Sequence, residues 1–327
     1  MMNKLTLSIW PLLLVTVVIS NSTISAKDVA QLEMVPGLHT PYYHSHDWQS
    51  PDQNVRVAVL FIHGTKRDSE NYFDRVVHAA EVAGAAEKTV ILVPQFSIEE
   101  EAAANQLFWS QAGWKQGDLA QNARKEFKIS SFDVVDELLS KLTTSKAFPN
   151  LERISVIGHS AGGQFVNRYV CAADLAKAHG IQVQFVIMNP STYLYLDGQR
   201  FCDGQCLNES DLKEVAPEYN NYRYGLEGLN TKMNQIGKDA IAERMVTRRC
   251  YYFGGTADTL EAYLDVTLPA MQQGVNRYER FKNYRAYVES FHDKRWKQNS
   301  SFREIPHVGH SSADTMASPV ISEVLFR

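Results

Sequence analysis

The sequence predicts an α/β fold with a mostly parallel central sheet flanked by helices. Short apolar runs rich in valine and isoleucine recur along the chain, as buried parallel strands require. Between them lie stretches in which apolar residues recur every three or four positions, the spacing of an amphipathic helix. Strands that alternate with helices pair in parallel through right-handed crossovers, so we expect helices on both faces of the sheet.

The elements follow one another in this alternating order. Residues 55–62 alternate at first and are then wholly apolar, which predicts the first buried strand. Apolar residues at helical spacing predict helices over 71–83 and 132–142, and a closing helix is expected over 315–326. A further helix starts after the turn at 158–162 and extends to about residue 177. The other strands are expected at residues 89–93, 153–157, 183–188, 249–253 and 302–305.

The turn at 158–162, which reads Gly-His-Ser-Ala-Gly, is the most informative segment of the chain. A strand leads directly into it and a helix leaves it. This arrangement lifts the hydroxyl of Ser160 above the sheet edge and points the free amides of a helix N-terminus at developing negative charge. Gly158 and Gly162 are expected because side chains would clash where the turn is tightest. We therefore predict that Ser160 is a nucleophile; the alternative is an ordinary Gly/Ser turn.

A serine nucleophile needs a base, and the base needs an orienting carboxylate. Asp258 and His310 each follow a predicted strand, so both are expected at the carboxyl edge of the sheet beside Ser160. The order serine, aspartate, histidine is the one expected for a nucleophile-elbow hydrolase. Asp265 is the rival acid, deeper in the segment that follows, and His307 is the rival base, three residues before His310.

The oxyanion of a tetrahedral intermediate needs two preorganised N–H donors. One is expected from the backbone of Ala161, immediately after the nucleophile. The other is expected from the backbone of Thr65, where Gly64 permits a close approach. His63 is interpreted as a structural hydrogen bonder, and His159 as the occupant of a free position in the turn.

Together these motifs resemble the α/β-hydrolase superfamily of serine hydrolases. The resemblance rests on the strand that ends at Thr65, the turn around Ser160, the post-strand Asp258 and the loop of His310, and it covers nearly the whole chain after residue 26. It implies the α/β-hydrolase fold and a Ser–His–Asp triad. Residues 189–193 and 273–277 resemble, more narrowly, secreted hydrolases related to poly(3-hydroxyalkanoate) depolymerases and other polyester or aromatic esterases.

The function expected from these residues is hydrolysis of carboxylic esters through an acyl-enzyme. A peptidase or amidase on the same triad is the first alternative, and a non-catalytic secreted binding protein on the same fold is the second. The predicted partner is a small-molecule or polymeric ester. No zinc-binding, phosphate-loop or dinucleotide motif is present, so neither a cofactor nor a metal is expected; residues 44–47, His-Ser-His-Asp, are interpreted as a polar loop.

A long insertion separates the strands at 183–188 and 249–253. At about sixty residues it is far longer than the usual connection in an α/β fold, and it is rich in tyrosine. Residues 191–248 are expected to form a lid or the wall of an acyl or aromatic pocket; alternatively, their aromatic side chains pack the insertion on the domain. Trp109 and Trp114 either flank the same site or belong to the core.

Residues 1–26 predict a signal peptide, followed by one domain over 27–327. Lys4 precedes a largely apolar stretch that ends in small residues, as a signal-peptidase site does. The stretch contains Pro11 and is short for a bilayer span, and an uncleaved anchor is the alternative. The expected location is secreted or periplasmic, with no stable membrane insertion after cleavage. The formal net charge of −4 and the lack of a basic run argue against a nucleic-acid partner.

The four cysteines are even in number, which in an oxidising compartment favours disulfides. Cys202 and Cys206 bracket three residues, so a small local loop is the first choice. That choice leaves Cys171 to pair with Cys250. A metal site is the competing interpretation, but the pair at 202 and 206 lacks a matching second pair of ligands.

Overall fold

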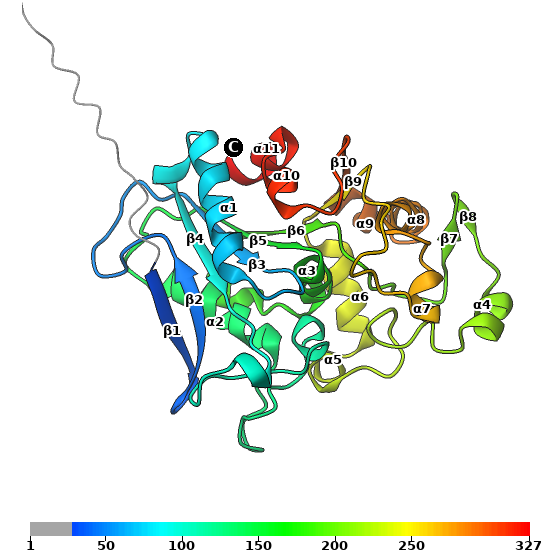
Figure 1. Cartoon of the computed structure of the whole chain (residues 1–327), viewed down its shortest axis with the longest axis horizontal. Coiled ribbons are helices and arrows are strands. Elements are labelled where there is room, and N and C mark those ends of the chain that lie inside the picture. Colours follow the sequence, from blue (N-terminus) through cyan, green and yellow to red (C-terminus); the bar gives the residue numbers. More distant parts are fainter. Residues whose placement is uncertain (1–27) are drawn as a thin grey trace, which may run out of the picture.

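An eight-stranded sheet runs through the centre of the protein, with helices on both of its faces (Figure 1). The structure is a computed structural model that describes residues 28–327, and the signal peptide predicted over residues 1–26 lies outside the described residues. Within 28–327 the strands of this sheet are β1 (Asp28–Val35), β2 (Leu38–His44), β3 (Val57–Ile62), β4 (Thr89–Pro94), β5 (Arg153–His159), β6 (Gln182–Met188), β9 (Cys250–Gly255) and β10 (Ser300–Ile305).

The sheet is mostly parallel, as predicted. Its strand order is β1-β2-β4-β3-β5-β6-β9-β10, and every pair from β4 to β10 is parallel. These six strands confirm the six expected from the sequence, with ends that differ by a few residues. The antiparallel edge formed by β1 and β2 was not predicted, because these strands mix polar and apolar residues and lack a long apolar run.

The helices of the described residues fill the connections. They are α1 (Ser69–Val82), α2 (Ser131–Thr144), α3 (Ala161–Ala172), α4 (Glu209–Val215), α5 (Thr231–Ile236), α6 (Lys238–Thr247), α7 (Leu268–Met271), α8 (Arg277–Ser290), α9 (Lys294–Asn299), α10 (Ser312–Met316) and α11 (Pro319–Phe326). The closing helix predicted over 315–326 is split in two, because Pro319 lacks the N–H that a continuous helix needs. Helix α3 ends at Ala172 rather than near residue 177, and a 3₁₀ turn follows it.

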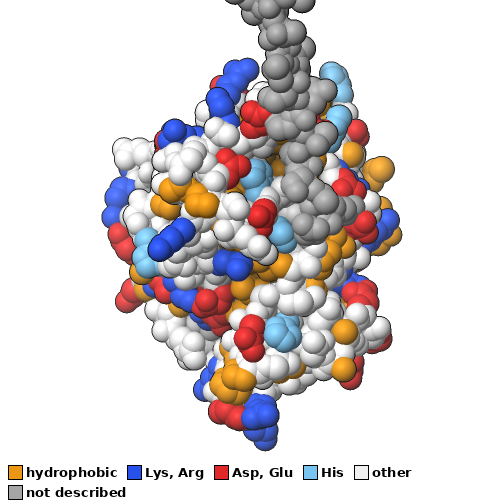
Figure 2. All heavy atoms as spheres, turned by 90° about the vertical axis from the view of Figure 1, so that its left-hand side faces the viewer, with side chains coloured by type: hydrophobic (Ala, Val, Ile, Leu, Met, Phe, Trp, Pro, Cys, Tyr) orange, Lys and Arg blue, Asp and Glu red, His pale blue; other side chains and the backbone are white. Residues whose placement is uncertain are grey.

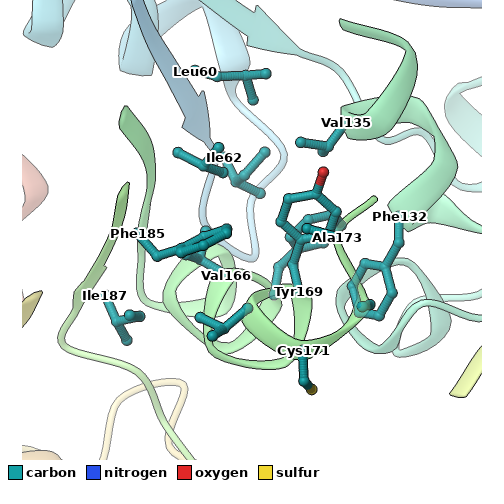
Figure 3. Close-up of a cluster of buried hydrophobic side chains, with 14 of the residues drawn as sticks. Leu60, Ile62, Phe132, Val135, Val166, Tyr169, Cys171, Ala173, Phe185 and Ile187 are labelled. Carbon is teal, nitrogen blue, oxygen red and sulfur yellow. The ribbon is translucent and has the colours of Figure 1, made fainter. Parts of the chain in front are cut away.

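The alternation of side chains along β3 divides the core into two layers. Leu60 and Ile62 join a cluster with residues of α2 and α3, part of which is drawn in Figure 3. Val59 and Phe61 join a second cluster with residues of α1 and α11. Successive strand residues point to opposite faces, so one apolar strand serves both layers. The central strands are thereby packed on both faces.

The long insertion packs most of its aromatic side chains inside the protein. Tyr193 and Tyr195 are fully buried, and Tyr193 stacks on Tyr284 of α8 with ring centroids 4.2 Å apart. Helix α6 packs on α3. Trp109 and Trp114 are likewise fully buried and contact Phe96, which places them in the core. The role of residues 191–248 as a lid stays a prediction.

The structure corrects the predicted disulfides, because all four cysteines are free thiols. In the small ribbon of β7 (Phe201–Cys202) and β8 (Gln205–Cys206), Cys202 lies opposite Gln205, and Cys206 lies opposite Phe201. Neighbouring strand positions face opposite sides, so Cys202 and Cys206 project away from each other. Cys171 and Cys250 are buried and unpaired by a disulfide, and the Cys171 thiol donates to the Arg168 carbonyl at 3.0 Å.

The surface beside β1 and β2 carries charges of both signs. In Figure 2 the Lys and Arg side chains are interspersed with Asp and Glu side chains over the visible face, and no continuous basic field is seen there. This distribution agrees with the small net charge of −4. Within residues 28–327, no helix combines the length and the apolar character that a membrane crossing requires.

Candidate active site

Ser160 sits in a strained turn between β5 and α3. Its backbone has φ 60° and ψ −118°, a conformation that residues other than glycine rarely adopt. The Ser160 N–H donates to the Met188 carbonyl of β6 at 3.0 Å, and its carbonyl accepts from the Gln164 N–H at 3.0 Å. These two bonds hold the strained residue from both sides, and its side chain faces a pocket.

Two glycines allow this turn to pack closely. A Cβ at Gly158 would collide with the carbonyl of Gly162, and a Cβ at Gly162 would collide with the carbonyls of Ile62 and His63. The obstacles are backbone atoms, which cannot turn aside as a flexible side chain can. These contacts confirm the steric reason predicted for both glycines, and they also place the start of α3 against the end of β3.

The structure brings Ser160, His310 and Asp258 together in one chain of hydrogen bonds. His310 Nε2 lies 2.8 Å from Ser160 Oγ, and His310 Nδ1 lies 2.8 Å from Asp258 Oδ2. The side chain of Asp258 is fully buried, whereas that of His310 is 17% exposed. Asp258 follows β9 and His310 follows β10, and these strands are parallel neighbours, so their loops leave the sheet side by side. The loops are also joined by the Ala257 N–H, which donates to the Val308 carbonyl at 3.0 Å.

The two rival residues have other partners. Asp265 Oδ2 lies 3.3 Å from Arg223 Nη2 and accepts from the Tyr224 hydroxyl at 3.0 Å. His307 has an exposed side chain and a backbone φ of 63°, and its N–H donates to Thr256 Oγ1 at 2.8 Å. The structure therefore places His310, and not His307, next to the serine hydroxyl.

Of the two residues whose backbone amides are predicted to bind the oxyanion, Ala161 is buried directly after Ser160, and only Thr65 lines the pocket. Ala161 is the first residue of α3, where N–H groups have no partner within the helix. Thr65 lines the pocket together with Ser160. A Cβ at Gly64 would collide with the hydroxyl of Tyr72, which explains the small residue before Thr65.

His63 fixes the loop that carries Thr65. Its Nδ1 donates to the Gly64 carbonyl at 2.9 Å, and its Nε2 accepts from the Phe96 N–H at 3.0 Å, which requires the neutral ring. Burial lowers the pKa of His63 to about 4. The side chain thus ties the end of β3 to the end of β4 without carrying charge.

His159 has a closer relation to the site than the sequence indicated. Its ring is buried and lies with its centroid 5.0 Å from that of His310, while its Nδ1 is 3.4 Å from the Tyr72 hydroxyl. Burial lowers the pKa of His159 well below its ordinary value. A neutral ring can pack against His310 without repelling the positive charge that a general base acquires. The only indication in the sequence that His159 lies near the site was its position directly before Ser160.

Arg277 is a second residue whose role the sequence did not indicate. It is the first residue of α8, and its Nη1 lies 3.5 Å from Asp258 Oδ1, with both side chains at most 1% exposed. The same guanidinium donates to the carbonyls of Leu260 at 3.1 Å and Ala262 at 2.7 Å. Arg277 therefore supplies a buried positive charge beside the acid and also fixes the loop that follows it.

A pocket of about 310 Å³ opens above Ser160. Most of its lining residues have hydrogen-bonding or charged side chains, among them Thr65, Lys66, Asp68, Tyr72, Arg75, Tyr263 and Ser312. Tyr263 is 67% exposed, and Lys66 Nζ lies 5.8 Å from the centre of its ring. The lining residues described here all lie outside the insertion at 191–248. Residues 28–327 contain no group of three His, Cys, Asp or Glu side chains arranged to hold a metal ion.

Comparison with known proteins gives structural relatives only. No protein-family model matches the chain, and no curated protein sequence matches it. A poly(3-hydroxybutyrate) depolymerase from Bordetella parapertussis has a similar structure, with a TM-score of 0.63 and 19% identity over 92% of this chain and 90% of its own. Poly(aspartic acid) hydrolase-1 from Sphingomonas sp. KT-1 has a TM-score of 0.61 and 21% identity over 92% of this chain and 98% of its own. The siderophore hydrolase EstB from Aspergillus nidulans has a TM-score of 0.51 and 11% identity, over 93% and 96%. At these identities the likeness shows a shared fold.

Proposed function

We propose that this chain, which has the α/β-hydrolase fold predicted from its sequence, is a secreted serine hydrolase that cleaves carboxylic esters. The observation that carries the proposal is the hydrogen-bonded chain from Ser160 through His310 to Asp258, with both bonds at 2.8 Å. A nucleophile within hydrogen-bond reach of a base, itself oriented by a carboxylate, is the arrangement that activates a serine hydroxyl.

The reaction proceeds in two displacements. His310 takes the proton of Ser160 as the serine oxygen attacks the ester carbonyl carbon, and the amides of Ala161 and Thr65 donate to the resulting oxyanion. Asp258 holds the imidazole and stabilises its positive charge. When the tetrahedral intermediate collapses, the carbon–oxygen bond to the alcohol breaks, and His310 protonates the departing oxygen. Water then attacks the acyl-enzyme with His310 again as the base, and the acid leaves as Ser160 recovers its proton.

An amidase on the same triad is the second candidate. It is favoured by the structural likeness to a protein named as a hydrolase of poly(aspartic acid), whose backbone is joined by amide bonds. An amide has a poorer leaving group than an ester, so it depends more strongly on proton donation by His310. Matched ester and amide substrates with the same acyl group separate the two functions. The third candidate, a binding protein without catalysis, is disfavoured because it has no need for the complete hydrogen-bonded chain from Ser160 to Asp258.

The secreted or periplasmic location rests on residues 1–26, whose pattern is that of a signal peptide. Expression of the full chain with its N-terminus intact, followed by sequencing of the exported protein, tests this part of the proposal. We expect a mature N-terminus directly after Ala26. An exported protein that retains the apolar stretch would instead indicate an anchor.

The central test compares the wild type with Ser160→Ala on p-nitrophenyl esters of increasing acyl length. We expect turnover to fall by about 10³-fold or more in the variant, because the attacking oxygen is missing. A fluorophosphonate probe, read by intact mass, should add to the wild type and not to the variant. Near wild-type turnover in Ser160→Ala would refute the mechanism, and a wild type that neither reacts with the probe nor hydrolyses any ester would refute the function.

A further inference from the structure

A second cavity adjoins the pocket above Ser160. Its volume is about 500 Å³, larger than the pocket, and it lies between α1 on one side and α10 with α11 on the other. Arg75 of α1 and Ala313 of α10 line both cavities. Because one residue from each wall is shared, the two cavities are neighbours along α1. We name it the α1–α11 groove.

One face of α1 lines both the pocket and the groove. Tyr72 and Arg75 line the pocket, and Arg75, Ala79 and Val82 line the groove. These positions recur at spacings of three and four and so lie on one side of the helix. At a rise of 1.5 Å per residue, the stripe from Tyr72 to Val82 is about 15 Å long. The helix face therefore forms a track that leads away from Ser160.

The character of this track changes from polar to apolar along its length. At the boundary, a guanidinium nitrogen of Arg75 donates to Ser312 Oγ at 2.5 Å and so joins the two walls. Beyond it most of the groove lining is apolar and includes Ala79, Val82, Met316, Pro319 and Phe326; His78, Ser322 and Arg327 are its polar members besides Arg75. Val82 is 76% exposed, so an apolar side chain is left uncovered at the rim. Of the described residues, no Asp or Glu side chain lines the groove.

The position of the groove relative to His310 determines which part of an ester reaches it. The base must return its proton to the leaving oxygen, so the alcohol part of the substrate lies on the His310 side of the scissile bond. Ser311, Ser312 and Ala313 follow His310 directly and lead from the pocket to the groove wall. We propose that the α1–α11 groove binds the alcohol portion of the substrate, which makes the substrate class esters of apolar alcohols. This inference rests on the proposed function.

The test uses two series of esters and two variants that fill the groove. In one series acetate is esterified with alcohols from methanol to octan-1-ol. In the other series the alcohol is always methanol and the acyl chain is lengthened. Ala317→Trp fills the groove from the α10 side, and Val82→Trp fills it from the α1 side. Glu81→Trp adds the same ring at an exposed position of α1 outside the groove lining and is the matched control.

For the wild type and Glu81→Trp, we expect kcat/KM to rise with each methylene of the alcohol, by at most about fourfold per group. In both groove-filling variants this rise should vanish, while methyl acetate and the whole acyl series are hydrolysed as in the wild type. An alcohol series unchanged by filling would overturn the proposal. A change confined to the acyl series would overturn it too, because the groove would then hold the acyl part.

Direct binding separates failure of the groove from failure of the proposed function. Octan-1-ol titrated into the wild type and Ala317→Trp, followed by calorimetry, reports on the groove without any turnover. If no ester is hydrolysed but octan-1-ol binds the wild type at least tenfold more tightly than Ala317→Trp, alcohol binding in the groove is supported and the proposed function is refuted. If esters are hydrolysed and octan-1-ol binds both proteins equally, the proposed function is supported and alcohol binding in the groove is refuted.

Discussion

At the residue scale, Asp258 has to satisfy two opposing demands. Its carboxylate is fully buried and so loses its hydration, which costs free energy unless the charge is paired, yet it must also bond to His310 Nδ1. Arg277 offsets this loss with a positive charge 3.5 Å away. Asp258 Oδ1 has no hydrogen-bond partner in the described structure, so the ion pair is its main compensation on that side. The acid and the arginine therefore function as one unit.

Replacing Arg277 with methionine should impair both stability and catalysis. Removing one partner of a buried ion pair costs about 3–5 kcal/mol in the free energy of unfolding. Because the buried carboxylate that holds the His310 ring loses its counter-charge, kcat should fall while KM changes less. Urea unfolding and ester kinetics measure the two effects.

Arg277→Lys separates charge from position. Lysine keeps the cation but cannot donate to the Leu260 and Ala262 carbonyls in the geometry of the guanidinium. We expect kcat to fall below that of the wild type but less than in Arg277→Met, since the charge is kept while the loop after Asp258 is held less firmly. If Arg277→Met keeps the wild-type kcat, the arginine is structural only.

Ser160, Asp258 and His310 could be proposed from sequence because each stands at a recognisable place in an ordered pattern. The contributions of Arg277 and His159 could not. Arg277 meets Asp258 only because α8 packs on the loop after β9, where the Tyr278 N–H donates to the Asp258 carbonyl at 3.2 Å. Nothing in the local sequence shows that contact. The same holds for the contact of the His159 ring with the ring of His310.

At the element scale, the junction of β5, α3 and the end of β3 sets the geometry of the site. The start of α3, with the amide of Ala161, can approach the loop of Thr65 only because Gly162 has no side chain. We expect Gly162→Ala to push these segments apart, at a cost of about 1–3 kcal/mol in unfolding free energy. Its kcat should fall more than its KM rises, because the amides proposed to bind the oxyanion move.

Gly309→Ala is the matched control for that substitution. Gly309 precedes His310, yet a Cβ there would meet its nearest atom, the Ala257 carbonyl oxygen, at 3.6 Å, an ordinary contact. We expect stability and kcat near those of the wild type. Thermal unfolding and ester kinetics of Gly162→Ala and Gly309→Ala test whether the close packing at Gly162 causes the losses. Equal losses in the two would mean that any added methyl near the site is harmful, and the argument from close packing would fail.

Elements that were not predicted from the sequence lack a regular apolar pattern, and α8 is an example. Helix α8 buries Arg277, Arg280 and Asn283 along with Tyr284 and Tyr287, so its apolar residues do not form the usual stripe. Its buried arginines donate to backbone carbonyls of the surrounding loops, as Arg280 does to those of Ser191 and Gly274. The central strands were predictable because both of their faces are buried and their apolar runs are continuous.

At the scale of the whole molecule, the functional loops meet because parallel strands end at one edge of the sheet. Thr65 follows β3, Ser160 follows β5, Asp258 follows β9 and His310 follows β10. Sequence predicts this convergence once the strands are recognised as parallel. It does not predict the α1–α11 groove, whose walls come from segments about 230 residues apart that meet only when the last helices pack on α1.

The buried histidines couple the stability of the whole fold to pH. His63 has a pKa of about 4 when folded, against an ordinary value of 6.5, so between these values the unfolded chain binds a proton that the folded chain does not. The free energy of unfolding therefore falls as pH drops from 6.5 to about 4, by about 1.4 kcal/mol per pH unit for one such group, and is not affected by His63 above that range. His159, whose pKa is also lowered by burial, acts in the same direction.

Urea unfolding at pH 7.5, 6.5, 5.5 and 4.5 measures this coupling. For His63→Gln we expect lower stability at pH 7.5, since the bonds to Gly64 and Phe96 are weakened, but a shallower loss of stability toward pH 4.5 than in the wild type. His307→Gln, at an exposed position, is the control and should follow the wild-type slope. Parallel curves for the wild type and His63→Gln would mean that other groups bind the protons. The loss of stability in acid could then not be assigned to His63.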